Sequence, residues 1–220
     1  MRNLLQVHGG LYPMADQQPE STAMNAPVAN LRVPTHPVDA QFLSRWSPRA
    51  FSEATMTEPE VLSVLEAARW APSASNNQPW RFVWGLRGDA GFAAILDGLV
   101  PFNQMWAGKA AALVMVASKT TVAGNEGEAA NPYHAFDTGT SWGHLALQAH
   151  LNGFITHGMA GFDHVKMAAN LHLPEGYALH AAVAIGRQGD AAGLPDMLRA
   201  REVQSGRLAL SEVARHGSFA

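Results

Sequence analysis

Apolar residues recur with helical spacing in several stretches of the chain. The clearest stretch begins at Thr57, which forms a capping box with Glu60, while Pro59 occupies the first turn, where a missing N–H is tolerated. The apolar stripe that follows has the i, i+3, i+4, i+7 spacing of a helix and consists of Val61, Val64, Leu65 and Ala68. Similar spacing predicts further helices over residues 39–46, 92–99, 135–151, 163–171 and 198–202.

The strand signals are shorter. Residues 111–117 read AALVMVA, a continuous apolar run that is typical of a strand buried on both faces. Shorter strands are predicted over residues 82–84, 154–158 and 179–186. Residues 118–131 are polar and contain two glycines, so we expect a loop there. Because helices and strands alternate irregularly, the pattern predicts an α+β layered fold.

The first 36 residues differ from the rest. They are rich in Pro, Ala, Asn, Gln and Ser and show neither helical nor strand periodicity. Such a segment buries too little apolar surface to offset its ordering entropy, so residues 1–36 are predicted to be a flexible arm without chemistry. Residues 37–220 are predicted to form a single domain that begins near Val38.

Composition narrows the function classes. Charged residues make up only 15% of the 220 residues and the net charge is −3, which argues against a nucleic-acid-binding protein and favours a surface partly hidden in an oligomer. The absence of cysteine excludes thiol nucleophiles, cysteine–zinc sites, iron–sulfur clusters and disulfides. No apolar stretch approaches the ~18 residues of a membrane span, and the N-terminus lacks a signal-peptide core. We therefore expect a cytoplasmic protein without membrane contact.

Common catalytic motifs are missing. The sequence contains no G-x-G-x-x-G, no Walker A loop, no H-E-x-x-H and no G-x-S-x-G. Ten histidines suggest a metal site, but the four in or beside one predicted helix are never three or four residues apart: His134, His144, His150 and His157. Zinc ligands on a helix need that spacing, so we expect surface or capping histidines and no metal.

Two polar segments carry candidate chemistry. In RWSPR, Arg45 and Arg49 flank the hydroxyl of Ser47 at a predicted helix end, an arrangement that suits a phosphate but also fits a solvated helix terminus. Residues 72–80, PSASNNQPW, form a polar, proline-bounded loop between a helix and a strand. Such loops often contact ligands, although this one could simply be a connection. Together the two segments are more specific than either one alone.

These segments and four others resemble the FMN-dependent nitroreductase family. The resemblance covers about residues 38–215, and its six features occur in the family's order. They are RWSPR, APSASNNQPW, Asn103, DTGTSWGHLALQAHLNG, MAGFD and SGRLALSEV. The resemblance implies a nitroreductase-like α/β/α layered sandwich with a central, mostly antiparallel sheet. It also implies a homodimer with exchanged termini, FMN as cofactor and NAD(P)H as co-substrate.

The resemblance also assigns roles to residues of this chain. Arg45 and Ser47 would hold the FMN phosphate and ribityl chain, with Arg207 closing on the phosphate. Arg49 would face the pyrimidine edge of the flavin, where a fixed cation stabilises the negative charge that builds on reduction. Asn103 would bond to the same ring system. The full set of implied cofactor-binding residues is Arg45, Trp46, Ser47, Arg49, Pro72, Ser73, Ala74, Asn76, Asn103, Ala160, Gly161 and Arg207.

In the family the backbone N–H groups at Ala160 and Gly161 point at flavin N5 and O4, and the loop at 72–74 comes from the partner subunit. Three departures matter. Ala160 stands where some members have Glu, which implies that the entrance to the flavin site is less acidic here. Ser205 stands where some members place a second cation for the phosphate, so Arg207 is the weakest of the transferred residues. Trp106 could be either a lid over the flavin or a core aromatic.

The implied reaction is a ping-pong oxidoreduction. NAD(P)H gives a hydride to flavin N5, and a flat electrophilic small molecule then takes it: a nitroaromatic, a quinone or a conjugated aldehyde. No side chain need act as acid or base, since proximity and flavin electrostatics provide catalysis. Three alternatives stay open: a relative that performs dehalogenation or flavin fragmentation, a flavin-binding protein that stores or senses without turnover, and a flavin-independent fold with a phosphate-binding arginine pair.

Overall fold

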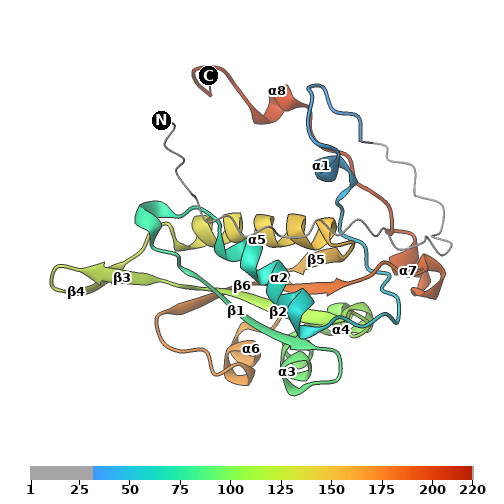
Figure 1. Ribbon diagram of the computed structural model, residues 1–220, viewed down its shortest axis with the longest axis horizontal. Coiled ribbons are helices and arrows are strands. Elements are labelled where there is room, and N and C mark those ends of the chain that lie inside the picture. Colours follow the sequence, from blue (N-terminus) through green and yellow to red (C-terminus); the bar gives the residue numbers. More distant parts are fainter. Residues whose placement is uncertain (1–31, 220) are drawn as a thin grey trace, which may run out of the picture.

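A four-stranded antiparallel sheet forms the centre of the fold (Figure 1). The computed structural model describes residues 32–219, so most of the predicted arm lies outside the described residues. The strands, in spatial order, are β1 (Trp80–Leu86), β2 (Ala112–Lys119), β6 (Tyr177–Gly186) and β5 (Ile155–Met159). Every neighbouring pair is antiparallel, as the family resemblance implied.

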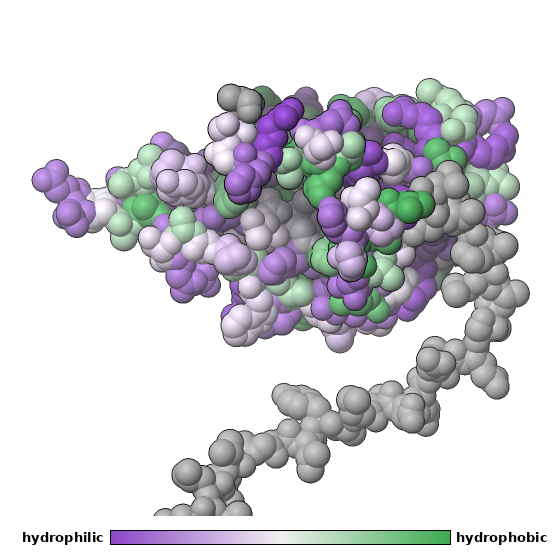
Figure 2. Space-filling model, turned by 90° about the horizontal axis from the view of Figure 1, so that it is seen from above, coloured by the Kyte–Doolittle hydropathy of each residue, from purple (hydrophilic) through white to green (hydrophobic). Residues whose placement is uncertain are grey.

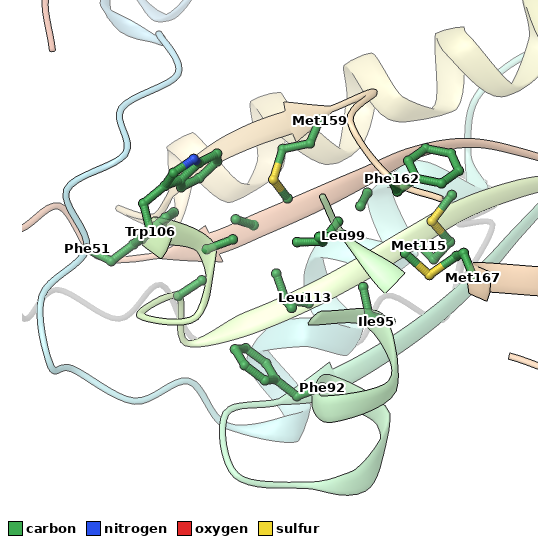
Figure 3. Close-up of a cluster of buried hydrophobic side chains, with 14 of the residues drawn as sticks. Phe51, Phe92, Ile95, Leu99, Trp106, Leu113, Met115, Met159, Phe162 and Met167 are labelled. Atoms are coloured by element: carbon green, nitrogen blue, oxygen red, sulfur yellow. The ribbon is translucent and has the colours of Figure 1, made fainter. Parts of the chain in front are cut away.

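Strand β2 is buried along almost its whole length because it lies inside the sheet with a helical layer on either face. Its side chains alternate between two apolar clusters. Leu113 and Met115 join the cluster shown in Figure 3, and Val114 and Val116 join the cluster on the opposite face. This two-sided burial explains why its sequence is apolar without alternation.

Helices cover both faces of the sheet, which confirms the predicted α/β/α arrangement (Figure 1). One face carries α2 (Glu58–Arg69) and α5 (His134–Leu151), and the other carries α3 (Ala90–Gly98), α4 (Pro101–Ala107) and α6 (His164–Asn170). The apolar stripe of α2 lies in the first of these layers, and its capping box forms, with Glu60 accepting from Thr57 N at 2.7 Å. No helix within residues 32–219 is long and apolar enough to span a bilayer.

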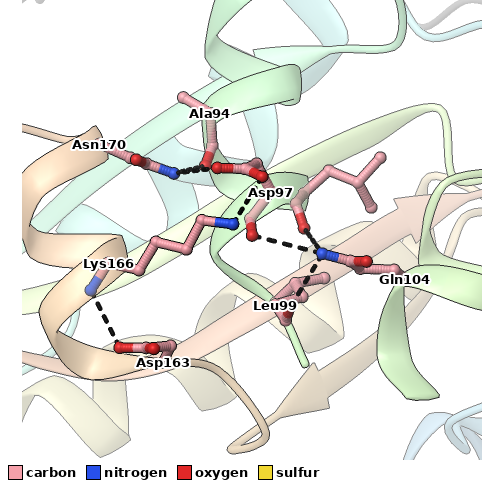
Figure 4. Close-up of polar contacts among 8 residues, drawn as sticks. Ala94, Asp97, Leu99, Gln104, Asp163, Lys166 and Asn170 are labelled. Carbon is pink, nitrogen blue, oxygen red and sulfur yellow. Dashed lines mark hydrogen bonds and ion pairs between the residues drawn. The ribbon is translucent and has the colours of Figure 1, made fainter. Parts of the chain in front are cut away.

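Polar contacts fix α4 against its neighbours (Figure 4). The amide of Gln104 donates to the carbonyl oxygens of Leu96 at 3.1 Å and Leu99 at 2.9 Å, where α3 ends. On the other side of α3, Lys166 Nζ pairs with Asp97 at 2.7 Å, which ties α6 to the same helix end. These contacts determine where the side chains of α4 lie relative to the sheet.

Two segments differ from the sequence-based expectation. Residues 118–131 do not form a plain loop, because β3 (Thr121–Gly124) and β4 (Gly127–Ala130) pair as a projecting hairpin (Figure 1). Its strands pack on no core, so no apolar alternation marks them. Helix α4 was not predicted: unlike α6, whose N-cap is Asp163, it follows Val100, which offers no capping side chain. The remaining short helices are α1 (Ala40–Ser44), η1 (Ala74–Asn76), η2 (Ala191–Gly193), α7 (Asp196–Arg199) and α8 (Leu210–Val213).

Candidate functional site

A cavity of about 300 Å³ lies where the segment after α1, the beginning of the C-terminal tail and β5 meet. It is lined by Arg32, Arg45, Trp46, Ser47, Arg49, His157, Arg201, Val203, Ser205 and Arg207. Five of these ten residues are arginines and none is acidic. Its volume is at the lower end of the range for small-molecule sites, so a larger ligand would extend beyond it.

The electrostatics of this cavity favour an anion. Burial, followed by the like charges of Arg32 and Arg207, lowers the pKa of the Arg45 guanidinium. Arg45 donates to Trp46 O at 3.0 Å and reaches Ser47 Oγ at 3.5 Å, so guanidinium and hydroxyl donors lie side by side. Planar guanidinium forks suit phosphate or carboxylate oxygens, and a bound anion would offset the mutual repulsion of the arginines.

Glu202 anchors the tail to this site. Its buried carboxylate accepts from Arg49 N at 2.7 Å and Ala50 N at 2.8 Å, and its second oxygen lies 3.9 Å from the Arg49 guanidinium. That guanidinium also lies 5.9 Å from the ring centre of Trp106. Arg49 Nε is buried without a hydrogen-bond partner among the described residues, and the Arg49 side chain also lines the cavity. Arg49 is therefore a positioned cation.

Trp106 is a core aromatic and not a lid. It is only 1% exposed and stacks on Phe51 in the cluster of Figure 3. Its ring also lies 4.6 Å from that of His157, whose Nδ1 donates to Pro48 O at 3.0 Å. Burial lowers the pKa of His157 to about 4, because desolvation outweighs the effect of the carbonyl at Pro48. The imidazole is therefore neutral at pH 7, so it lines the cavity as an uncharged side chain.

This depressed pKa predicts a stability change in acid. Below its ordinary pKa of 6.5, His157 takes up a proton in the unfolded chain but not in the folded one, until the pH reaches about 4. The free energy of unfolding should therefore fall as the pH drops from 6.5 to 4, by up to about 3 kcal/mol. Urea unfolding of the wild type and of His157→Gln across this range tests it, with exposed His216→Gln as control. Equal pH slopes in all three proteins would contradict the assignment.

A second group of predicted site residues lies where β5 ends. Asn103 on α4 donates to Gly161 O at 2.9 Å, and Val100 N donates to the same oxygen at 3.1 Å. A Cβ on Gly161 would come within 2.6 Å of the Asn103 amide, so this close approach requires glycine. Ala160 lies three residues beyond His157, about 10 Å along an extended chain. Asn103, Ala160 and Gly161 thus lie together, one short strand length from the arginine cavity.

The loop that follows α2 is not part of the cavity in the same chain. Pro72, Ser73, Ala74 and Asn76 lie beyond the C-terminus of α2, whereas the arginine segment leads into its N-terminus (Figure 1). Twelve helical residues separate these two ends by roughly 18 Å.

The loop is nevertheless well defined. Ala74 N donates to the buried Asp137 carboxylate at 3.1 Å, and Gln78 N donates to Ser73 Oγ at 3.0 Å. Ser75, Asn76 and Gln78 all have positive φ angles, of 50°, 55° and 48°. Each is strained for a residue with a side chain, and such strain is often concentrated at functional sites.

Sequence reasoning placed Arg45, Trp46, Ser47, Arg49 and Arg207 at a site, and the structure brings these five together. Sequence reasoning missed five other residues that line the cavity: Arg32, His157, Arg201, Val203 and Ser205. Arg32 belongs to the arm to which no chemistry was assigned, and His157 was expected at the surface or at a helix cap. No local pattern identifies either residue, because only the tertiary fold brings them to the cavity. Within residues 32–219, no group of three His, Asp or Glu side chains could hold a metal ion.

Comparison with known proteins agrees with this geometry. The sequence model of the nitroreductase family matches residues 43–97, which include both the arginine segment and the loop after α2. A crystal structure described as an oxidoreductase containing FMN is 42% identical to this chain. It covers 90% of this chain and 99% of its own length, with a TM-score of 0.84. The chain belongs to the nitroreductase family.

Two further relatives complete this comparison. An uncharacterized 15.4 kDa protein of Mycolicibacterium smegmatis is 34% identical over 147 residues, which are 63% of this chain and 97% of the relative. A nitroreductase family protein from Streptococcus pneumoniae TIGR4 is 19% identical and shares the fold, with a TM-score of 0.63 over 78% of this chain and 95% of its own. The nitroreductase fold is thus present in this chain.

Proposed function

We propose that this member of the nitroreductase family is an FMN-dependent oxidoreductase. It would use NAD(P)H to reduce nitroaromatics, quinones or similar electrophilic acceptors in a ping-pong reaction. The observation that carries the proposal is the cavity with five arginines and the Ser47 hydroxyl, in a chain 42% identical to an oxidoreductase containing FMN. When bound, FMN supplies the centre that accepts and then donates a hydride.

The donor set of the cavity fits the phosphate end of FMN. Arg45 and Ser47 present a guanidinium and a hydroxyl side by side, and Arg207 approaches from the tail, where it donates to Gly206 O at 2.9 Å and Ser205 Oγ at 3.2 Å. A phosphate dianion would accept charge-assisted hydrogen bonds from these groups. We assign Arg45, Ser47 and Arg207 to the phosphate and the adjoining ribityl chain, with Trp46 beside them.

Arg49 fits the electrostatic role at the flavin ring. Glu202 fixes its backbone, and Trp106 lies against its guanidinium, so the cation is in place before any charge develops. Such preorganised charge stabilises a developing anion without reorganisation during the reaction. Asn103, with the backbone N–H groups of Ala160 and Gly161, would face the same ring. No acid or base among the side chains is required, and the neutral His157 stays bonded to Pro48.

We propose further that the working unit is a homodimer with exchanged terminal segments. The loop at 72–76 lies away from the cavity of its own chain, so a second chain would have to supply it. Large apolar side chains are exposed on α5 and after α2, among them Phe136 at 76% and Trp70 at 70%. Figure 2 shows apolar patches on the upper side of the molecule in Figure 1, which is the side of α5 and the C-terminal tail. Exposed apolar surface of this kind supports a protein–protein interface.

An anaerobic visible spectrum tests the proposed function. The protein, supplemented with FMN and desalted, should keep the flavin colour and lose it when NADH or NADPH is added. Subsequent addition of a nitroaromatic or a quinone should restore the colour. Retained colour that neither nucleotide bleaches would favour a storage or sensing protein. A colourless desalted protein would overturn FMN as the cofactor.

A further inference from the structure

Arg32 joins three separate segments at the arginine cavity. Its Nε donates to Ser205 O at 3.0 Å, and one terminal nitrogen donates to Arg45 O at 2.6 Å and Leu43 O at 3.1 Å. It therefore links the end of α1 to the tail, and Ser205 lies 173 positions beyond Arg32 itself. The side chain also lines the cavity itself. Arg32 lies in the segment whose composition predicts a flexible arm, so its position at the centre of the site is unexpected.

The backbone hydrogen bonds of Arg32 do not by themselves require a positive charge in this cavity. A neutral donor could bond to the same carbonyl oxygens, whereas a guanidinium adds a positive charge beside Arg45 and Arg207. Arg207 lies close enough for its charge, after burial, to lower the pKa of Arg32. A multiply charged anion in the cavity would interact favourably with both cations.

Ser205 in the tail contacts two arginines of the cavity. Position 205 carries a serine, whose side chain brings no charge, and its carbonyl oxygen accepts from Arg32 instead. Arg207 bonds to the hydroxyl of the same serine at 3.2 Å, so both guanidiniums meet at one residue. With Arg45 they form a cluster of three cations that come from three different parts of the chain.

We propose that Arg32 is a further phosphate-binding residue of this cofactor site, supplied by the N-terminal segment. The segment around Arg32 is then part of the binding site and not a dispensable arm. The proposal rests on the proposed function, because it takes FMN as the ligand. It concerns only the phosphate end of that ligand, which makes it separately testable.

The test compares FMN with riboflavin, which lacks the phosphate, in titrations of full-length apoprotein followed by flavin fluorescence. Arg32→Ala should weaken FMN binding by about tenfold to a hundredfold, the range expected for a lost hydrogen bond to a charged group. Riboflavin affinity should change by less than about threefold. Arg32→Lys should recover part of the FMN affinity, because lysine restores the positive charge but not the planar, bidentate donor geometry of the guanidinium. The FMN affinity of the wild type should also fall more steeply with added salt or inorganic phosphate than that of Arg32→Ala.

Arg87→Ala serves as the matched control. Arg87 likewise donates to three backbone carbonyl oxygens, those of Lys109, Glu53 and Ala54, but it lies outside the cavity. A purely structural role for Arg32 would weaken FMN and riboflavin binding by the same factor, or leave both unchanged, and either result overturns the proposal. Wild-type protein that binds neither flavin would instead overturn the proposed function, so the two failures are distinguishable.

Discussion

Arg45→Ala and Arg49→Ala are expected to impair the protein in opposite ways. Loss of Arg45 should reduce FMN affinity by roughly a hundredfold, because the variant removes a fork of charge-assisted donors from the phosphate end. Loss of Arg49 should change affinity much less but lower the reduction potential of the bound flavin. A fixed cation about 5 Å from the developing charge contributes on the order of 3 kcal/mol at an effective dielectric constant of about 20. For a two-electron couple this corresponds to roughly 70 mV.

The structure supports this division of roles through the different surroundings of the two guanidiniums. Arg45 faces Ser47 Oγ and shares the cavity with Arg32 and Arg207, so its charge belongs to a cluster that a phosphate would compensate. Arg49 is held by Glu202 at the backbone and lies against Trp106. Loss of the Arg49 side chain leaves the backbone contact to Glu202 in place, so the fold of this segment should survive.

Two measurements on each variant separate these effects: the dissociation constant for FMN and the potential of the bound flavin under anaerobic redox titration. Arg87→Ala is again a suitable control, because Arg87 bonds to three backbone oxygens away from the cavity and from the loop after α2. It should leave affinity and potential unchanged. If both cavity variants changed affinity and potential to the same extent, the two arginines would not have distinct roles.

The parts of the fold that sequence could predict are those whose signal is local. The capping box at Thr57 and the apolar run of β2 each specify one element over a few neighbouring residues, and both form. Helix α4 has no capping side chain at its start, and β3 and β4 pair with each other without a core. Their existence depends on contacts that an apolar pattern does not record.

The same reasoning explains which parts of the site were found. Arg45, Ser47 and Arg49 form one contiguous motif, which the sequence singles out as a candidate for anion binding together with the loop at 72–80. Arg32 and the tail residues reach the cavity from opposite ends of the chain, and no local spacing connects them. Glu202 likewise shows its role only when the tail lies against the backbone of Arg49.

The proposed dimer predicts that two defective chains can restore one site. Arg45→Glu damages the arginine cavity, and Pro72→Glu places a carboxylate on the loop beyond α2. Pro72 is exposed in the single chain, so the second substitution should spare its fold. Each variant alone should lose its flavin on desalting. A mixed dimer, however, combines the intact cavity of one chain with the intact loop of the other, so it should retain flavin at one of its two sites.

Co-expression with two different affinity tags and tandem purification isolates this mixed dimer, and the flavin-to-protein ratio of the product is then measured. A dimer of two differently tagged Arg45→Glu chains is the control, and it should contain no flavin. A colourless mixed dimer would mean that the loop and the cavity act within one chain, although the loop lies outside the lining of its own chain's cavity. The homodimer of Pro72→Glu must also be colourless; a ratio near one flavin per mixed dimer then requires that a site draws its cavity from one chain and its loop from the other.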